Sequence, residues 1–392
     1  LSAMYQGHYE TEAGMYKDAA AVAGRVAAPP SGHPDANPNL LRPEGPQVSC
    51  LISEDPAEHE LRLLAQMGVT RCFTWIERVE HETAEHLAKI KGRCAEFGVE
   101  LYNVGCLRHA KNSRIILGAP DRDAAIAEFC TFVRAVGAAG IGVTTFTWEP
   151  DGVWSVASAE TRGGAAGRAM DAAALESLPA SHGRVFEDEE LWGTMKYFLE
   201  RVLPVAEASG VRLALHPNDP PMDALVCGVR PLMRTRGAFE RAFALADATG
   251  HGRSLGMEFC CGCWLEGGKA FGDVYGDLEA FCRAGRVLIV HLRNVTSPLP
   301  RFVETFIDGG YGDVCRILRS MIAGSYGGTV ILDHTPPFVE EAGPAAASAF
   351  AVGYMKAGIR AAQSEAERRA AEAASSAGTS SSGAAALAAP AE

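Results

Sequence analysis

The chain has 392 residues, of which 47% are hydrophobic and 21% charged, a composition typical of a globular protein with one large core or two ordinary ones. Its formal net charge of −12 argues against nucleic acid as the main partner, because phosphate binding needs a basic surface. No run approaches the roughly 20 apolar residues of a membrane helix, and the N-terminus lacks the features of a secretory signal, so we expect no membrane partner.

The eleven cysteines are scattered along the chain without a compact framework. An odd number in a long chain indicates reduced thiols in a reducing compartment, with metal binding or catalysis as the alternative uses. We therefore expect a cytoplasmic protein. Organellar targeting stays open, because the chain begins at Leu1 and we expect a fragment or a processed chain.

Composition divides the chain into three segments. Residues 1–45 are rich in Ala, Gly and Pro without a sustained period, which predicts a poorly ordered N-terminal segment. Residues 46–362 have the regular pattern of a catalytic domain. Residues 363–392 are predicted to be a disordered tail, because their Ala, Ser and Gly residues bury too little apolar surface to offset the chain entropy.

Eight short apolar runs with β-forming residues follow one another in the middle segment, and amphipathic stretches with helical spacing separate most of them. Several runs are nearly continuous in apolar residues, as in parallel strands that are covered on both faces. Eight strands alternating with helices predict an α/β fold, a (β/α)8 or TIM barrel. An open doubly wound sheet is the alternative, but no glycine-rich phosphate turn follows the first run. The runs are Val48–Ser53, Thr70–Ile76, Val99–Cys106, Gly142–Trp148, Arg212–Asn218, Ser254–Cys261, Val287–Asn294 and Gly328–His334.

The connection between the fourth and fifth runs, from Glu149 to Glu190, is unusually long for a compact barrel. A loop of that length is usually a lid or an excursion that helps to build the site. We expect such a role here.

Potential metal ligands stand at the ends of four consecutive runs: His216, Cys260, His291 and Asp333. Active sites of TIM barrels lie at the carboxyl ends of the strands, and neighbouring strands are about 4.8 Å apart, so these side chains can converge. Two imidazoles, a thiolate and a carboxylate suit a borderline divalent ion such as Mn²⁺, Fe²⁺, Co²⁺ or Zn²⁺. Each residue alone would be read as a core or rim residue, but their coincidence predicts a metal site.

Neighbouring residues supply further chemistry. Arg293 lies two residues after His291, on the same side of the strand, where it can either grip a substrate carboxylate or pair with an acid of the barrel. Asp333 and His334 are adjacent, and either can serve as a base or an acid. Cys260 and Cys263 have the spacing of a redox pair, but the surrounding sequence lacks the thioredoxin pattern.

The residues from Leu203 to Pro221, which include His-Pro-Asn-Asp-Pro-Pro, closely resemble the central signature of the mannonate dehydratase family of xylose-isomerase-like barrels. Cys260-Cys261-Gly262, His291-Leu292-Arg293 and Asp333-His334 follow in the same order as in that family. The resemblance covers roughly residues 48–360 and is strongest from 190 onward. It implies a hydro-lyase of glucuronate catabolism that removes water from a small sugar acid, converting D-mannonate to 2-keto-3-deoxy-D-gluconate.

The same resemblance implies roles for individual residues. Mn²⁺ or Fe²⁺ would be held by the matching His216, Cys260, His291 and Asp333. Asp333, His334 and Arg293 would be catalytic, with Arg293 also holding the substrate carboxylate. His109, which matches a histidine in a loop of the family, and Asp219 would bind substrate.

The chain departs from the family at three places. Asn218 replaces the first Asp of the signature, Thr335-Pro336 replaces Gly-His, and Ala345 stands where the family carries a Tyr. These departures keep open a catalytically altered metal-binding barrel. A sugar isomerase or epimerase on the same barrel is a second alternative, and Cys260 counts against it because such enzymes commonly hold their metal with carboxylates and no thiolate. A homo-oligomer also stays open.

Overall fold

The structure is a computed structural model that describes residues 39–150, 155–343 and 345–383, the last seven of these by their backbone alone. Of the segment predicted to be poorly ordered, residues 1–45, the first 38 residues lie outside the described part of the chain.

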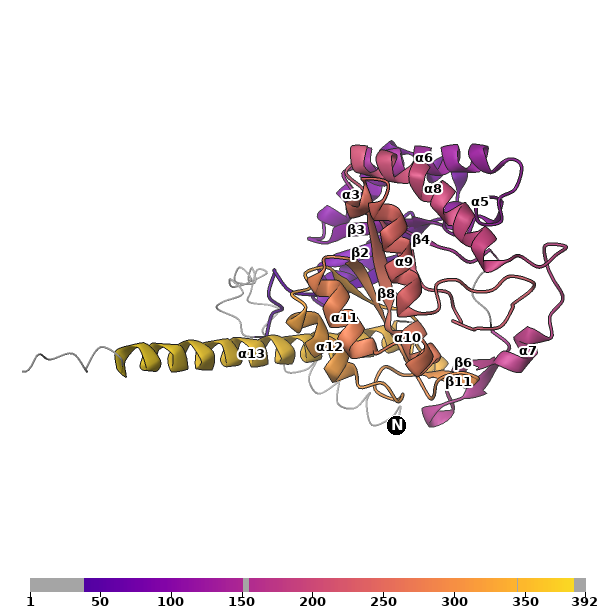
Figure 1. The fold of residues 1–392 in the computed structure, drawn as a ribbon. Coiled ribbons are helices and arrows are strands. Elements are labelled where there is room, and N and C mark those ends of the chain that lie inside the picture. Colours follow the sequence, from indigo (N-terminus) through magenta and orange to yellow (C-terminus); the bar gives the residue numbers. More distant parts are fainter. Residues whose placement is uncertain (1–38, 151–154, 344, 384–392) are drawn as a thin grey trace, which may run out of the picture. The chain divides into compact units, whose positions relative to one another are not determined.

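Eight parallel strands close into a barrel in the order β1-β12-β9-β8-β7-β4-β3-β2, with β1 paired to both β12 and β2 (Figure 1). Each strand lies within or next to one of the eight predicted runs, so the predicted TIM barrel is confirmed. The strands are β1 (Gln47–Ile52), β2 (Arg71–Ile76), β3 (Glu100–Cys106), β4 (Val143–Thr147), β7 (Arg212–His216), β8 (Leu255–Cys260), β9 (Val287–Leu292) and β12 (Thr329–Leu332).

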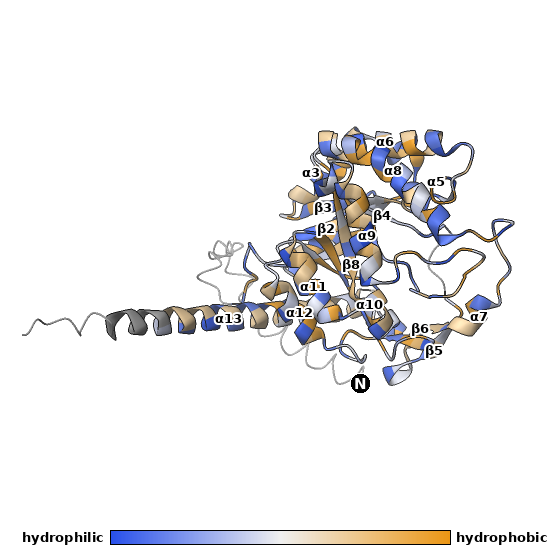
Figure 2. Ribbon diagram, viewed as in Figure 1, coloured by the Kyte–Doolittle hydropathy of each residue, from blue (hydrophilic) through white to orange (hydrophobic). Residues whose placement is uncertain are grey.

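Helices cover the outside of the barrel and bury one face each. In α12 the buried side chains include Val314, Ile317, Leu318 and Met321, which recur with helical spacing. The helices carry both hydrophobic and hydrophilic residues (Figure 2). The longer ones are α2 (Glu58–Gln66), α3 (Ala84–Ala95), α6 (Arg122–Ala138), α8 (Asp188–Ala208), α9 (Arg236–Asp247), α11 (Val274–Arg283), α12 (Val314–Ala323) and α13 (Ala346–Gly383).

Short helical segments connect these elements. Among the described residues, none of the helices combines the length and the apolar character that crossing a bilayer requires. The short segments are α4 (Leu107–Ala110), α5 (Ser113–Ile116), α7 (Ala172–Glu176), α10 (Cys261–Gly267), η1 (Val79–His81), η2 (Arg162–Gly164), η3 (Gly252–Ser254), η4 (Gly268–Ala270) and η5 (Glu340–Ala342).

The long connection after β4 forms half of a second, four-stranded sheet. Its strands β5 (Ala157–Glu160) and β6 (Ala166–Asp171) join β10 (Asn294–Val295) and β11 (Arg301–Thr305), which follow β9, in the order β10-β11-β6-β5. All three pairings are antiparallel, and β6 lies beside β11 (Figure 1). This sheet was not predicted, and it joins two connections that leave the carboxyl ends of barrel strands.

The C-terminal helix differs from its predicted boundary. α13 continues as one helix to Gly383, whereas the sequence predicted a disordered tail from residue 363. The first part of α13 buries Ala351, Met355 and Ile359. Further on, ion pairs between residues four apart, Arg368 with Glu372 and Arg369 with Glu365, run along an alanine-rich helix. Alanine is the strongest helix former, and the compositional prediction considered only the lack of burial.

Candidate active site

A cavity of about 390 Å³ lies at the carboxyl ends of the barrel strands. Apolar and aromatic side chains such as Phe73, Trp75 and Leu332 line it together with polar groups from several strands. The polar residues in its lining are Lys111, Thr145, Thr147, His216, Asp219, Glu258, His291, Asp333 and His334. Three of the four expected metal ligands therefore line one cavity, and the fourth, Cys260, lies directly beside them.

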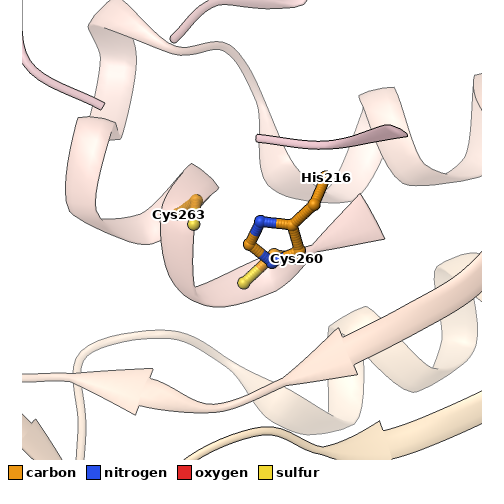
Figure 3. A group of neighbouring side chains, drawn as sticks. All are labelled: His216, Cys260 and Cys263. Carbon is orange, nitrogen blue, oxygen red and sulfur yellow. The ribbon is translucent and has the colours of Figure 1, made fainter. Parts of the chain in front are cut away.

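Cys260 is the centre of the expected metal-binding group. Its Sγ atom, a ring nitrogen of His291 and a carboxylate oxygen of Asp333 all lie within 4.8 Å of one another. Its Sγ atom is 3.5 Å from Oδ2 of Asp333, and the rings of His216 and His291 are 5.3 Å apart at their centroids. A second group within the same limit joins Cys260 to His216 and Cys263 (Figure 3). The structure thus brings the four predicted ligands together and adds Cys263.

Polar contacts on one ring nitrogen hold each of the two imidazoles, His216 and His291, in place. Nδ1 of His216 donates to the carbonyl oxygen of Pro217 at 2.6 Å, which leaves Nε2 as the nitrogen with the lone pair. Nε2 of His291 lies 2.5 Å from Glu258. Nδ1 of His291 is buried, has no hydrogen-bond partner among the described residues and lies 3.4 Å from Asp333. The donor types and this unpaired buried nitrogen fit a divalent cation.

The electrostatics of the group also favour a cation. Burial alone would raise the pKa of the Cys260 thiol, but a hydrogen bond from Cys263 and the charge of Arg293 hold that pKa well below its ordinary value. Burial would lower the pKa of His291, yet the negative charges of Glu258 and Asp333 raise it well above its ordinary value. Thiolate and carboxylate charges therefore lie around the imidazoles of His216 and His291.

Arg293 does not reach the cavity, in contrast to its predicted role in holding a substrate carboxylate. Its side chain is 0% exposed, and four carboxylates surround its guanidinium. Nε donates to Asp333 at 2.7 Å, Nη2 to Asp219 at 2.6 Å and Nη1 to Glu304 at 2.7 Å, and Glu266 contacts Nη1 as well. With its donors occupied in this way, Arg293 has the second role that the sequence left open, pairing with acids of the barrel.

The excursion contributes a second arginine to this network. Arg168 of β6 donates to Asp219 at 2.9 Å, to Glu304 at 2.8 Å and to Glu266 at 3.1 Å. Asp219 therefore lines the cavity with its two carboxylate oxygens already paired to Arg293 and Arg168. Its predicted contact with substrate stays a prediction.

His109 is also placed away from the cavity lining. Its side chain is buried, Nε2 lies 2.9 Å from Oε2 of Glu82, and the ring packs against Phe129 and Phe132. This packing holds the ring against α6, and the predicted contact of His109 with substrate hydroxyls stays a prediction. Lys111, two residues later, lines the cavity instead.

Lys111 and Glu258 are residues that the sequence analysis missed. Nζ of Lys111 is 3.1 Å from Oε2 of Glu149, at the end of β4. Both residues carried a signal: Lys111 follows the third strand at its carboxyl end, and Glu258 lies two residues before Cys260 and so points to the same side of β8.

His334 reaches the cavity beside Asp333. Its Nδ1 atom lies 2.8 Å from Oε1 of Glu304, its Nε2 atom lies 3.3 Å from Oδ1 of Asp333, and its side chain is 39% exposed. The negative charge of Asp333 raises the pKa of His334 against the effect of burial. A fixed but accessible imidazole of this kind can exchange protons with a bound molecule.

Asn218, one of the departures from the family signature, has a structural explanation. Its amide nitrogen donates to the carbonyl oxygen of Trp148 at 3.1 Å, and its Oδ1 atom accepts from the backbone N–H of Met233 at 2.7 Å. An aspartate could not donate the first of these bonds. The amide therefore links the exit of β4 to the loop after β7.

Comparisons with known proteins agree with the fold and the motifs. A family model described as D-mannonate dehydratase (UxuA) matches residues 173–364. The mannonate dehydratase of Streptococcus suis (strain 05ZYH33) is 27% identical over 278 residues, which cover 64% of this chain and 73% of that protein. Mannonate dehydratase 1 of Bacillus licheniformis is 26% identical over 285 residues, covering 64% and 75%.

Solved structures share the architecture. The crystal structure of mannonate dehydratase from Streptococcus suis serotype 2 has a TM-score of 0.71 and 23% identity, and covers 82% of this chain and 96% of its own. A xylose isomerase-like TIM barrel protein from Mycobacterium smegmatis, solved in complex with magnesium, has a TM-score of 0.54 and 11% identity, with coverage of 82% and 99%. The fold is thus shared with mannonate dehydratase and with a xylose isomerase-like TIM barrel protein. In sequence the chain is similar to the mannonate dehydratases, which confirms the predicted resemblance and the hydro-lyase class.

Proposed function

We propose that the chain is a divalent-metal-dependent dehydratase that removes water from D-mannonate to give 2-keto-3-deoxy-D-gluconate, in cytoplasmic glucuronate catabolism. The observation that supports this proposal is the convergence of His216, Cys260, His291 and Asp333 beside one cavity at the carboxyl ends of the strands. We propose these four side chains as the ligands of Mn²⁺ or Fe²⁺. A cation bound by them would stabilise the negative charge that develops on the substrate when the proton beside its carboxylate is removed.

Lys111 takes over the role that the sequence assigned to Arg293. Among the described residues that line the cavity, Lys111 is the only lysine or arginine. Its contact with Glu149 holds the ammonium group at the wall of the cavity. In this proposal Lys111 binds the carboxylate of the sugar acid as a point charge.

Asp333 and His334 are the proposed proton-transfer pair. The reaction takes a proton from C2 and returns a proton to the departing C3 hydroxyl, which leaves as water, and the resulting enol becomes the 2-keto acid. His334 suits this task because Glu304 fixes its Nδ1 side while the ring stays accessible from the cavity. Proton transfer by a positioned side chain typically contributes about 10²–10⁴-fold to a rate.

The test is anaerobic reconstitution with Mn²⁺ or Fe²⁺, followed by an assay for keto-deoxy acids with a panel of hexonates. We expect product from D-mannonate, and we expect His334→Asn to lower kcat by about 10²-fold or more at unchanged metal content. His59→Asn, which changes an exposed histidine of α2, is the matched control and should keep full activity. Stoichiometric metal without product from any hexonate would overturn the dehydratase proposal in favour of the catalytically altered barrel.

A further inference from the structure

Cys263 lies beside the proposed metal ligands although the resemblance assigns it no role. β8 ends at Cys260 and α10 starts at Cys261, so the first turn of α10 brings Cys263 back toward Cys260. The two sulfurs and a ring nitrogen of His216 lie within 4.8 Å of one another, and Figure 3 shows the imidazole of His216 next to Cys260 with the Cys263 sulfur nearby.

The turn that places Cys263 is held by close packing. A Cβ atom added at Gly262 would lie 2.3 Å from Nε of Arg293, so only glycine allows this approach. Nη2 of Arg293 is 3.5 Å from Sγ of Cys263 and 3.9 Å from Sγ of Cys260. A guanidinium next to both sulfurs stabilises negative charge on them. The packing therefore holds both sulfurs beside one positively charged side chain.

We propose that Cys263 is a second thiolate ligand of the bound cation, so that Cys260, Cys263 and His216 form a thiol-rich face of the site. Thiolate ligands favour Zn²⁺ and Fe²⁺ over harder cations such as Mg²⁺ and Mn²⁺, so this chain should bind Zn²⁺ more tightly than a site with a single thiolate would. The inference rests on the proposed metal site and not on the proposed reaction.

Coordination by Cys263 would release the proton of its thiol. A metal ligand must be a thiolate. Binding of a cation by the Cys263 sulfur would therefore break the S–H bond of that thiol, and the proton would go to solvent as the sulfur–metal bond forms.

Cys261 offers a matched control. It lies between the two proposed ligands and is equally buried, but it belongs to none of the possible ligand groups among the described residues. Replacing Cys261 with Ser tests the effect of losing a buried thiol from this turn without losing a donor to the metal.

The experiment uses the full chain loaded anaerobically with Co²⁺, because thiolate–Co²⁺ bonds give a charge-transfer absorption that increases with the number of thiolates. We expect Cys263→Ser and Cys260→Ser each to lose about half of this absorption, and Cys261→Ser to keep it. Zn²⁺ affinity should fall by about tenfold or more in Cys263→Ser, by analogy with the loss of groups that support a metal site.

A measurement on the unmodified protein covers the case in which a variant does not fold. X-ray absorption at the zinc edge should count two sulfur neighbours per Zn²⁺. One sulfur per Zn²⁺, or undiminished charge transfer in a folded Cys263→Ser variant, would overturn the proposal and leave Cys263 as a hydrogen-bond donor to Cys260. Neither readout uses the dehydratase reaction, so failure to turn over D-mannonate would not change the sulfur count.

Discussion

Glu149 is a buried carboxyl group, and its Oε2 atom lies 3.1 Å from the ammonium nitrogen of Lys111. Its Oε1 atom also accepts the backbone N–H of Asp219 at 3.2 Å. Burial, reinforced by the charge of Asp219 and opposed by that of Lys111, raises the pKa of Glu149 to about 7. The protonated and ionised forms of Glu149 are therefore both present near neutral pH.

This raised pKa has a consequence for stability. Unfolded Glu149 ionises near pH 4.5, whereas the folded group stays protonated up to about 7. The folded state therefore binds more protons between these values, and stability falls as pH rises through that window. Glu149→Gln should remove this loss, so the variant should gain on the order of 3 kcal/mol relative to wild type between pH 4 and pH 8.

Urea unfolding at the two pH values measures this difference, and Glu176→Gln, a change in an exposed glutamate, is the control. A stability difference between Glu149→Gln and wild type that does not change with pH would contradict the assignment of the raised pKa to Glu149.

Arg293 carries a buried positive charge, and its removal should lower the free energy of unfolding. Arg293→Met would remove the arginine that pairs with four carboxylates, those of Asp219, Glu266, Glu304 and Asp333. Arg168 would still pair with the first three of them. Removing one partner of a buried ion pair typically costs about 3–5 kcal/mol, because the opposite charges stay buried without compensation.

We expect a loss of this size in the free energy of unfolding, measured in urea. Arg319→Met is the matched control, because Arg319 is half-exposed and its nearest acid is 4.0 Å away. Equal stability of the two variants would mean that the carboxylates around Arg293 are protonated in the native protein.

The site residues divide into those that sequence could predict and those that it could not. The strand-end rule identified His216, Cys260, His291 and Asp333, because each stands at the carboxyl end of an apolar run. It could not distinguish Arg293 from Lys111 as the cation of the cavity. That distinction depends on Asp219, Glu266 and Glu304, which come from three separate connections and meet only in the folded barrel.

At the scale of elements, the second sheet couples the excursion to the loop after β9. Gly167 of β6 lies against β11, and a Cβ atom at this position would be 2.2 Å from the carbonyl oxygen of Glu304. The backbones must approach closely here, and this approach also places the neighbouring Arg168 in the buried network. Glycine at 167 is therefore a requirement of the β6–β11 contact.

Gly167→Ala should push β6 away from β11, at a cost of about 1–3 kcal/mol. We expect faster cleavage within residues 155–187 in limited proteolysis, with the sites mapped by mass spectrometry. Gly193→Ala in α8 is the control, because nothing lies within 4 Å of the added methyl group and alanine favours a helix. Unchanged proteolysis of Gly167→Ala would show that the strand tolerates a shift.

Burial decides which strands could be predicted from the sequence. The barrel strands were visible because both their faces are covered, which makes them continuous apolar runs. β5 was not visible, because its sequence is Ala-Ser-Ala-Glu and three of its four residues are exposed. The pairing of Arg301 with Asp171 joins residues far apart in the chain, and no local pattern marks it.

At the scale of the whole molecule, the proposed ligands lie at the ends of four neighbouring strands of the closed barrel. His216, Cys260 and His291 belong to β7, β8 and β9, and Asp333 directly follows β12, the next strand in the barrel order. A cation held by all four would connect segments from residue 216 to residue 333. Because these side chains converge only in the folded barrel, such a cation would bind the native state in preference to the unfolded one.

Metal removal should therefore lower the stability of the entire barrel. A ligand at 100 times its Kd stabilises the native state by about 2.7 kcal/mol, because its binding is linked to folding. In a chain of this size that corresponds to a rise in Tm of roughly 3–4 °C. Calorimetry of chelated protein titrated with Mn²⁺ or Zn²⁺ measures this rise. Cys260→Ser should lose most of the shift and Cys261→Ser should keep it, because only Cys260 belongs to the ligand group. If both variants responded to metal like the wild type, the cation would bind elsewhere and the four strand ends would not be joined by it.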